Sequence, residues 1–148
     1  MVKSEHAYEL GHKGEQAVFE ILEGQGWDVE WPSGFDEDLL VNGHLTIEVK
    51  TAEASSRRGG RQKRWQFCLY PHPGRDKPFC EDVLILRCQS EPPVHFIIPG
   101  FLIRTGLTKI DITTQDPSKY KGKWSIFRGR WEVISVMEAA FQYWASLR

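Results

Sequence analysis

The chain has 148 residues, 41% of them hydrophobic, with six Trp and eight Phe and a formal net charge of −1. This length and composition predict one globular domain over residues 1–148 and exclude a disordered chain. No apolar run approaches the roughly 20 residues that a membrane helix needs. The first ten residues also lack the apolar stretch of a signal peptide, so we expect a cytoplasmic protein without membrane contact.

The small net charge conceals a division along the sequence. Residues 1–53 carry twelve Asp and Glu against three Lys and Arg, a net −9, whereas the rest carry eight against sixteen, a net +8. An acidic region beside a basic one suggests that a cation-binding part adjoins a polyanion-binding part. The alternative is that the two halves intermix in the fold and the asymmetry cancels in space.

In chain order, residues 5–24 have the apolar spacing of an amphipathic helix, which Gly24 and Gly26 end. A short strand at 27–31 follows, then a hairpin that turns at Asn42-Gly43, and a basic loop at 55–64. Further strands are expected at 65–70, 82–88 and 94–99, weaker ones at 108–113 and 124–128, and a helix at 135–147. This order predicts an α/β fold with a central mixed sheet flanked by helices.

Apolar side chains alternate along both arms of the hairpin, and they determine its register. All five are odd-numbered, namely Leu39, Val41, Leu45, Ile47 and Val49. They share one face only if the sequence numbers of two paired residues add up to an even number. This condition excludes a plain two-residue Asn-Gly loop. The pattern therefore predicts a three-residue loop or a bulge, with Gly43 supplying a positive φ.

Four charged residues fall on the opposite face of this hairpin: Asp36, Asp38, Glu48 and Lys50. Glu37 does not. If neighbouring elements bury this face, the three carboxylates repel one another and a divalent cation relieves the repulsion. The alternative is a solvated face with ion pairs from Lys50 to Asp36 or Glu48.

The "DLLV" segment, the turn and "IEVKT" together resemble the PD-(D/E)xK nuclease superfamily, whose core is restriction-endonuclease-like and which includes Holliday-junction resolvases. In this resemblance Asp38 begins the second core strand, and Glu48 and Lys50 are the E-x-K of the third. Glu15 in "GHKGEQAV" matches the helical Glu of many members. The sequence departs from the family in one respect, since Pro32 precedes Asp36 by four residues. Spacing alone leaves Asp36 and Asp38 both open as the ligand.

The resemblance implies a DNA nuclease that uses Mg²⁺, with Mn²⁺ as a substitute. Its metal ligands would be Asp38, Glu48 and the Val49 carbonyl, with Glu15 holding a second metal or a metal-bound water. Lys50 would orient or deprotonate the water and offset phosphate charge. Gln66 is a further catalytic candidate, because it follows the basic loop.

The basic loop carries five cations and no acid: Arg57, Arg58, Arg61, Lys63 and Arg64. Such a loop suits contacts to DNA phosphates without base reading, although a merely solvated loop would have the same composition. A second basic set at residues 119–130 either extends the DNA track or is ordinary surface. Cutting two strands generally needs two active centres, so we expect a homodimer or a recruiting protein partner.

Three alternatives remain open at this stage. One is a catalytically inactive nucleic-acid-binding module on the same fold, and another is a protein-interaction domain whose charges only aid solubility. The third concerns Cys68, Cys80 and Cys88, which could bind zinc together with His72, although their spacing fits no common zinc pattern. They form no Cys-x-x-Cys pair, so a disulfide framework is not expected.

Overall fold

The computed structural model describes residues 5–32, 39–56, 62–69 and 79–148. Its main sheet has five strands in the order β1-β2-β3-β6-β7. β3 and β6 are parallel, whereas the other neighbours are antiparallel, so the sheet is mixed as predicted. The strands are β1 (Val29–Glu30), β2 (Leu39–Val41), β3 (Leu45–Ala52), β6 (Val83–Cys88) and β7 (Val94–Pro99).

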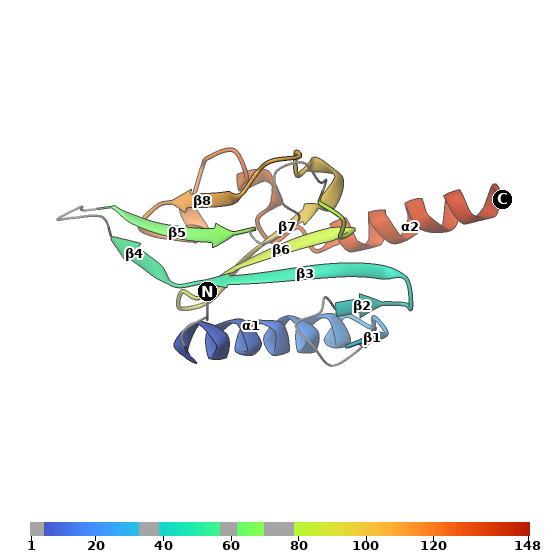
Figure 1. Cartoon of the computed structure of the whole chain (residues 1–148), viewed down its shortest axis with the longest axis horizontal. Helices are drawn as coiled ribbons and strands as arrows, with labels where there is room; N and C mark the ends of the chain where they lie inside the picture. Colours follow the sequence, from blue (N-terminus) through green and yellow to red (C-terminus); the bar gives the residue numbers. More distant parts are fainter. Residues whose placement is uncertain (1–4, 33–38, 57–61, 70–78) are drawn as a thin grey trace.

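A second, antiparallel sheet has the order β4-β5-β8 and consists of β4 (Ala54–Ser56), β5 (Lys63–Cys68) and β8 (Lys109–Thr113). The two α-helices are α1 (Glu5–Gly24) and α2 (Glu132–Ser146). Figure 1 shows α1 alongside β3, and α2 extending away from the sheets toward the C-terminus. Three short 3-10 helices complete the described chain: η1 (Gly100–Leu102), η2 (Pro117–Lys119) and η3 (Ser125–Phe127).

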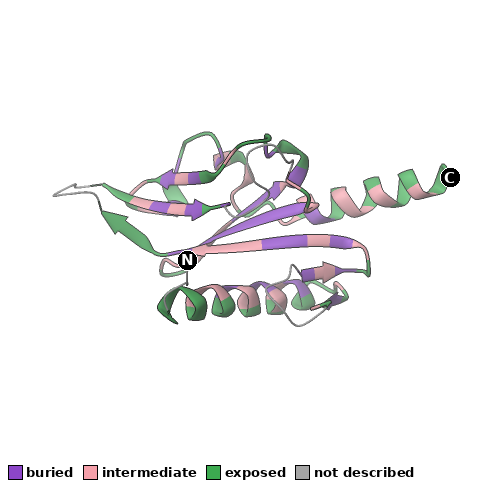
Figure 2. Ribbon diagram, in the orientation of Figure 1, coloured by how far each residue is buried: buried purple, intermediate pink, exposed green. Residues whose placement is uncertain are grey.

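The strand β6 is buried along its whole length because both faces of the main sheet are covered (Figure 2). On one face, Val83 and Ile85 join a core with Val18 and Leu22 of α1. On the other face, alternate β6 residues join a core with the second sheet, whose members include Leu84, Leu86, Trp65 and Phe67. This two-sided burial explains why the sequence of β6 is a nearly continuous apolar run.

Most predicted elements are confirmed, and the structure differs most clearly from the prediction in three places. The predicted strand at 124–128 is wrong, because i→i+3 hydrogen bonds such as Phe127 N to Trp124 O close the 3-10 helix η3 there. β5 begins at Lys63, so Lys63 and Arg64 lie in a strand and not in the predicted loop. α2 begins at Glu132, three residues before its predicted start. Within the described residues, no helix is long and apolar enough to cross a membrane.

Candidate active site

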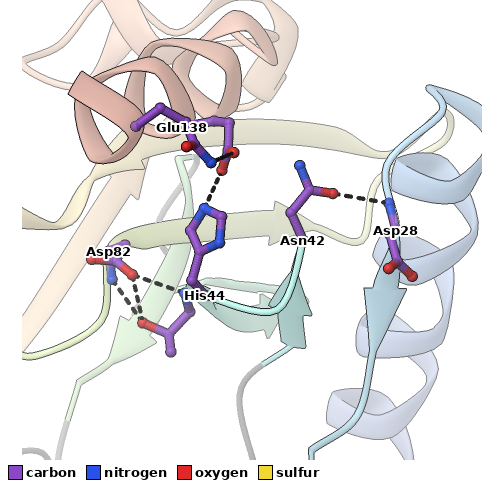
Figure 3. A network of polar contacts seen from close by, with 7 residues as sticks. Asp28, Asn42, His44, Asp82 and Glu138 are labelled. Atoms are coloured by element: carbon purple, nitrogen blue, oxygen red, sulfur yellow. Dashed lines mark hydrogen bonds and ion pairs between the residues drawn. The ribbon is translucent and has the colours of Figure 1, made fainter. Parts of the chain in front are cut away.

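The β2–β3 hairpin has the register that the odd-numbered apolar residues predict. Leu39 pairs with Ile47, and Val41 pairs with Leu45. The loop is three residues long, and its first two, Asn42 and Gly43, have φ of 53° and 77°. The backbone N–H of Asn42 donates to the carbonyl of Asp28 at 2.8 Å, which ties the loop to the start of the sheet. Figure 3 shows the second link between them, from the Asp28 N–H to the Asn42 side chain.

Glu48 and Lys50 lie on the other face of β3, next to Leu84 and Leu86 of β6. The Nζ of Lys50 is 2.9 Å from Oε1 of Glu48, and the two side chains are only 20% and 9% exposed. This is the Glu48–Lys50 ion pair that the sequence left open, but it is not a solvated one. A buried carboxylate is costly unless it is paired, so Lys50 stabilises a negative charge at a position shielded from water.

Near the pair, β2 begins at Leu39, which is also the first described residue of its segment. The ladder between β2 and β3 ends at Leu39 and Ile47, whereas β3 continues to Ala52 alongside β6. Glu48 is the first β3 residue beyond that ladder. Asp36, Glu37 and Asp38 lie outside the described residues, so their predicted faces stay predictions. Asp38 immediately precedes Leu39 in the sequence.

Glu15 is placed near β3 by an unusually close contact of α1 with that strand. A Cβ on Gly14 would lie 1.8 Å from Oγ1 of Thr51, so only glycine permits this approach. Thr51 follows Lys50, and Glu15 follows Gly14 and is half-buried. The fold thus brings the helical turn that carries Glu15 to the end of β3 that carries Lys50, but on the face of the strand opposite to Glu48 and Lys50. The metal role of Glu15 stays a prediction.

A polar clamp that sequence reasoning missed aligns β3 with β6. Oδ2 of Asp82 accepts hydrogen bonds from the Thr46 backbone N–H at 2.9 Å and from the Thr46 hydroxyl at 3.1 Å. The backbone N–H of Asp82 donates back to Oγ1 of Thr46 at 3.1 Å. Figure 3 labels Asp82 and draws its polar contacts as dashed lines. Asp82 stands just before an apolar strand, but its partner, 36 residues away, cannot be recognised without the pairing of the two strands.

The positions of Val49 and Gln66 do not by themselves indicate a role in the site. The Val49 side chain packs against the core on the α1 side, which leaves only its backbone for a ligand role. Gln66 lies on the face of β5 opposite to Trp65 and Phe67, and its strand neighbour is Asp111. The register thus places Gln66 on the side of β5 that is turned away from the core between the sheets. The site role of Gln66 stays a prediction.

The predicted DNA-binding cations are only partly described. Lys63 is exposed at the start of β5, and Arg64 is half-buried beside it. Within the described chain, the Arg64 Nε has no hydrogen-bond partner although it is buried. Arg57, Arg58 and Arg61 lie outside the described residues. In the sequence, this segment stands between β4 and β5, which pair antiparallel.

The described residues include no group of three or more His, Cys, Asp or Glu side chains that could hold a metal ion. Glu48 supplies one hard oxygen ligand of the kind that Mg²⁺ prefers, and a complete set would need Asp36 or Asp38. The three cysteines form no disulfide, and Cys68 and Cys80 are exposed whereas Cys88 is buried. Burial raises the pKa of Cys88 to about 12, which keeps its thiol protonated and opposes zinc binding. His72 lies outside the described residues.

Comparison with known proteins identifies the fold. No protein family and no curated protein matches the sequence. The structure is similar to that of a bacterial homing endonuclease, I-Ssp6803I, with a TM-score of 0.71 over 96% of this chain and 99% of that one. The two sequences are 20% identical, so the likeness concerns the fold. The chain therefore shares the mixed α/β fold of that protein.

Proposed function

We propose that the chain is a metal-dependent endodeoxyribonuclease of the PD-(D/E)xK type, with its active site at Glu48 and Lys50. The observation that carries the proposal is the Glu48–Lys50 ion pair, in which the carboxylate is buried and the ammonium group is largely shielded from water. Its E-x-K spacing on one strand face is that of the superfamily that the sequence resembles. The likeness of the fold to a homing endonuclease supports the same class of reaction.

In this proposal, Glu48 and Asp38 hold a Mg²⁺ ion, with the Val49 carbonyl as a further ligand. Asp36 is the alternative to Asp38. When bound, the metal would polarise the phosphate and lower the pKa of a bound water, for which Mn²⁺ can substitute. Glu48 fits this role because it is an oxygen donor held in a shielded position by β3.

Lys50 has two roles in the proposed site. Without a metal, its ammonium group neutralises Glu48 and makes the burial of that carboxylate tolerable. With a cation bound beside Glu48, Lys50 Nζ would be available to contact the scissile phosphate and to orient the attacking water. Glu15, the match to the family's helical Glu, would contribute a further carboxylate only by reaching past β3, because α1 packs on the face of that strand opposite to Glu48 and Lys50.

DNA is the proposed substrate, and the β4–β5 hairpin is its proposed contact. Lys63 and Arg64, together with Arg57, Arg58 and Arg61 from the sequence, would bind backbone phosphates. Binding of this kind weakens as salt is added, because each phosphate contact releases counterions. We further propose, from the sequence, that the protein acts in the cytoplasm.

The test is a cleavage screen over linear, nicked, flapped and four-way DNA with Mg²⁺, Mn²⁺, Ca²⁺ or EDTA. We expect cleavage with Mg²⁺ or Mn²⁺, binding without cleavage in Ca²⁺, and no cleavage in EDTA. Asp38→Ala and Lys50→Ala should abolish cleavage. Glu30→Gln, an exposed change on β1, is the control that should cut like the wild type.

Two results would contradict the proposal. If cleavage continues in EDTA, the reaction does not depend on a metal. If the wild type binds DNA but cuts none of the substrates with any metal, the chain is the inactive nucleic-acid-binding module instead. Absence of salt-sensitive DNA binding would favour the protein-interaction domain.

A further inference from the structure

The outward side of α2 carries large apolar side chains that are exposed to solvent. Within the helix only Ile134 is buried. Val136, Tyr143 and Trp144 are 63%, 68% and 51% exposed, and Leu147, which follows the helix directly, is 68% exposed. Figure 1 shows this helix extending beyond the sheets. Apolar surface gathered in this way on one element is typical of an interaction site.

The opposite side of α2 is anchored to the body of the protein. Ile134 belongs to the core on the α1 side of the main sheet. The ring of His44, in the hairpin loop, bonds Glu138 at 2.6 Å and stacks on Phe141 with 3.9 Å between ring centroids. Figure 3 shows His44 pointing at Glu138. These contacts fix the orientation of the helix, so its exposed side is presented in a constant direction.

The spacing of the exposed residues matches the contact surface of a paired helix. Val136, Ala140, Tyr143 and Leu147 follow one another at intervals of four, three and four residues, which is the a/d pattern of a coiled coil. All four are exposed. The segment 139–147, "AAFQYWASL", contains no charged residue. The surface therefore suits another helix, and it lacks the flanking charges that would select an unlike partner.

We propose that this surface binds α2 of a second copy of the chain, in an antiparallel and two-fold symmetric arrangement. In that arrangement Tyr143 packs against Ala140 of the second copy and Val136 against Leu147, so that large residues meet small or medium ones. A parallel pair would instead place Tyr143 on Tyr143. The antiparallel pair also brings Glu132 of one copy near Arg148 of the other and aligns the two helix dipoles favourably.

The area available is sufficient for a specific dimer. A fully covered aromatic side chain buries roughly 150–250 Å², and valine and leucine bury less because they are smaller. With the exposures above, Val136, Tyr143, Trp144 and Leu147 offer on the order of 500 Å² per copy by that measure. Two copies would bury about 1,000 Å², which is the lower limit for a specific interface.

The proposed interface leaves the candidate active site free. In Figure 1, α2 extends from the end of the molecule opposite to the β4–β5 hairpin. The interface therefore competes with neither the basic residues nor the Glu48–Lys50 pair. Its test is the oligomeric state without DNA, so the result does not depend on whether the chain is a nuclease.

The experiment measures the mass of the full chain by light scattering after gel filtration. We expect the wild type to have the mass of two 17.1 kDa chains. The double variant Tyr143→Glu, Leu147→Lys should have half that mass. Its melting temperature should be that of a folded monomer. Phe101→Glu, which changes an apolar residue that is 75% exposed elsewhere, is the matched control and should leave the mass unchanged.

A charge exchange tests the antiparallel orientation. Glu132→Lys alone should weaken the dimer, and adding Arg148→Glu in the same chain should restore it. A wild type that remains a monomer at all concentrations would overturn the proposal. An assembly of any size that the Tyr143→Glu, Leu147→Lys variant does not reduce would also overturn it, because the interface would then lie elsewhere.

Discussion

Burial gives individual charged residues of this protein very different roles. The exposed acids of α1 can exchange partners with water at little cost, and their ion pairs contribute little to stability. The Glu48 side chain is 9% exposed and has Lys50 at 2.9 Å, and this partner stabilises its charge. This difference is what makes Glu48 a candidate ligand, since a buried carboxylate is ready to bind a cation that replaces the lysine.

His95 provides a prediction about pH at the same scale. Arg87 Nη1 donates to His95 Nε2 at 2.8 Å, and burial together with the Arg87 charge lowers the His95 pKa from 6.5 to about 4. The folded state therefore keeps His95 neutral, whereas the unfolded chain takes up a proton below pH 6.5. The free energy of unfolding should fall by about 2 kcal/mol between pH 7.5 and pH 5 from this group.

The measurement is urea unfolding at both pH values for the wild type and His95→Gln. The glutamine oxygen can still accept from Arg87 but does not titrate, so the variant should lose most of this pH dependence. His12→Gln, which changes an exposed residue of α1, should keep it. If His95→Gln shows the same pH dependence as the wild type, another group is responsible.

At the scale of elements, the contact between α1 and β3 decides how close Glu15 comes to the candidate site. Gly14→Ala would place a Cβ 1.8 Å from Thr51 Oγ1, so the helix or the strand must move. We expect the free energy of unfolding to fall by about 1–3 kcal/mol, despite the higher helix propensity of alanine. Gly11→Ala, in the same helix with open space around it, should instead raise it by roughly 0.5–1 kcal/mol.

Chemical denaturation of both variants checks this prediction. If Gly11→Ala and Gly14→Ala raise the free energy of unfolding equally, α1 does not lie as close to β3 as the structure places it. If both variants have a lower free energy of unfolding than the wild type, alanine has a general effect on the helix and the Thr51 contact is not the cause.

The elements that depend on local pattern could be predicted from the sequence. The helix at 5–24 and the hairpin register follow from the spacing of apolar residues, and both are confirmed. The parallel pairing of β3 with β6 joins distant segments, so local pattern does not reveal it. The Thr46–Asp82 clamp depends on that pairing and was missed with it. At 124–128, local 3-10 hydrogen bonds replace the expected strand.

At the scale of the whole molecule, the two faces of the main sheet carry different groups. The main sheet carries Glu48 and Lys50 on the face that it shares with the second sheet, and helices cover its other face. The sequence could indicate that Glu48 and Lys50 share a face, because strands alternate. It could not show that the face is buried, because burial comes from Trp65 and Phe67 in a strand of the other sheet.

The central claim is that Glu48 serves as a metal ligand in DNA cleavage. The most direct test is the single-turnover cleavage rate of Glu48→Gln in Mg²⁺, because glutamine keeps the size of the side chain and removes its charge. We predict a rate lower than that of the wild type by a factor of at least about 100, from the loss of a ligand, with DNA binding in Ca²⁺ retained. A Glu48→Gln protein that cuts DNA as fast as the wild type would contradict the account.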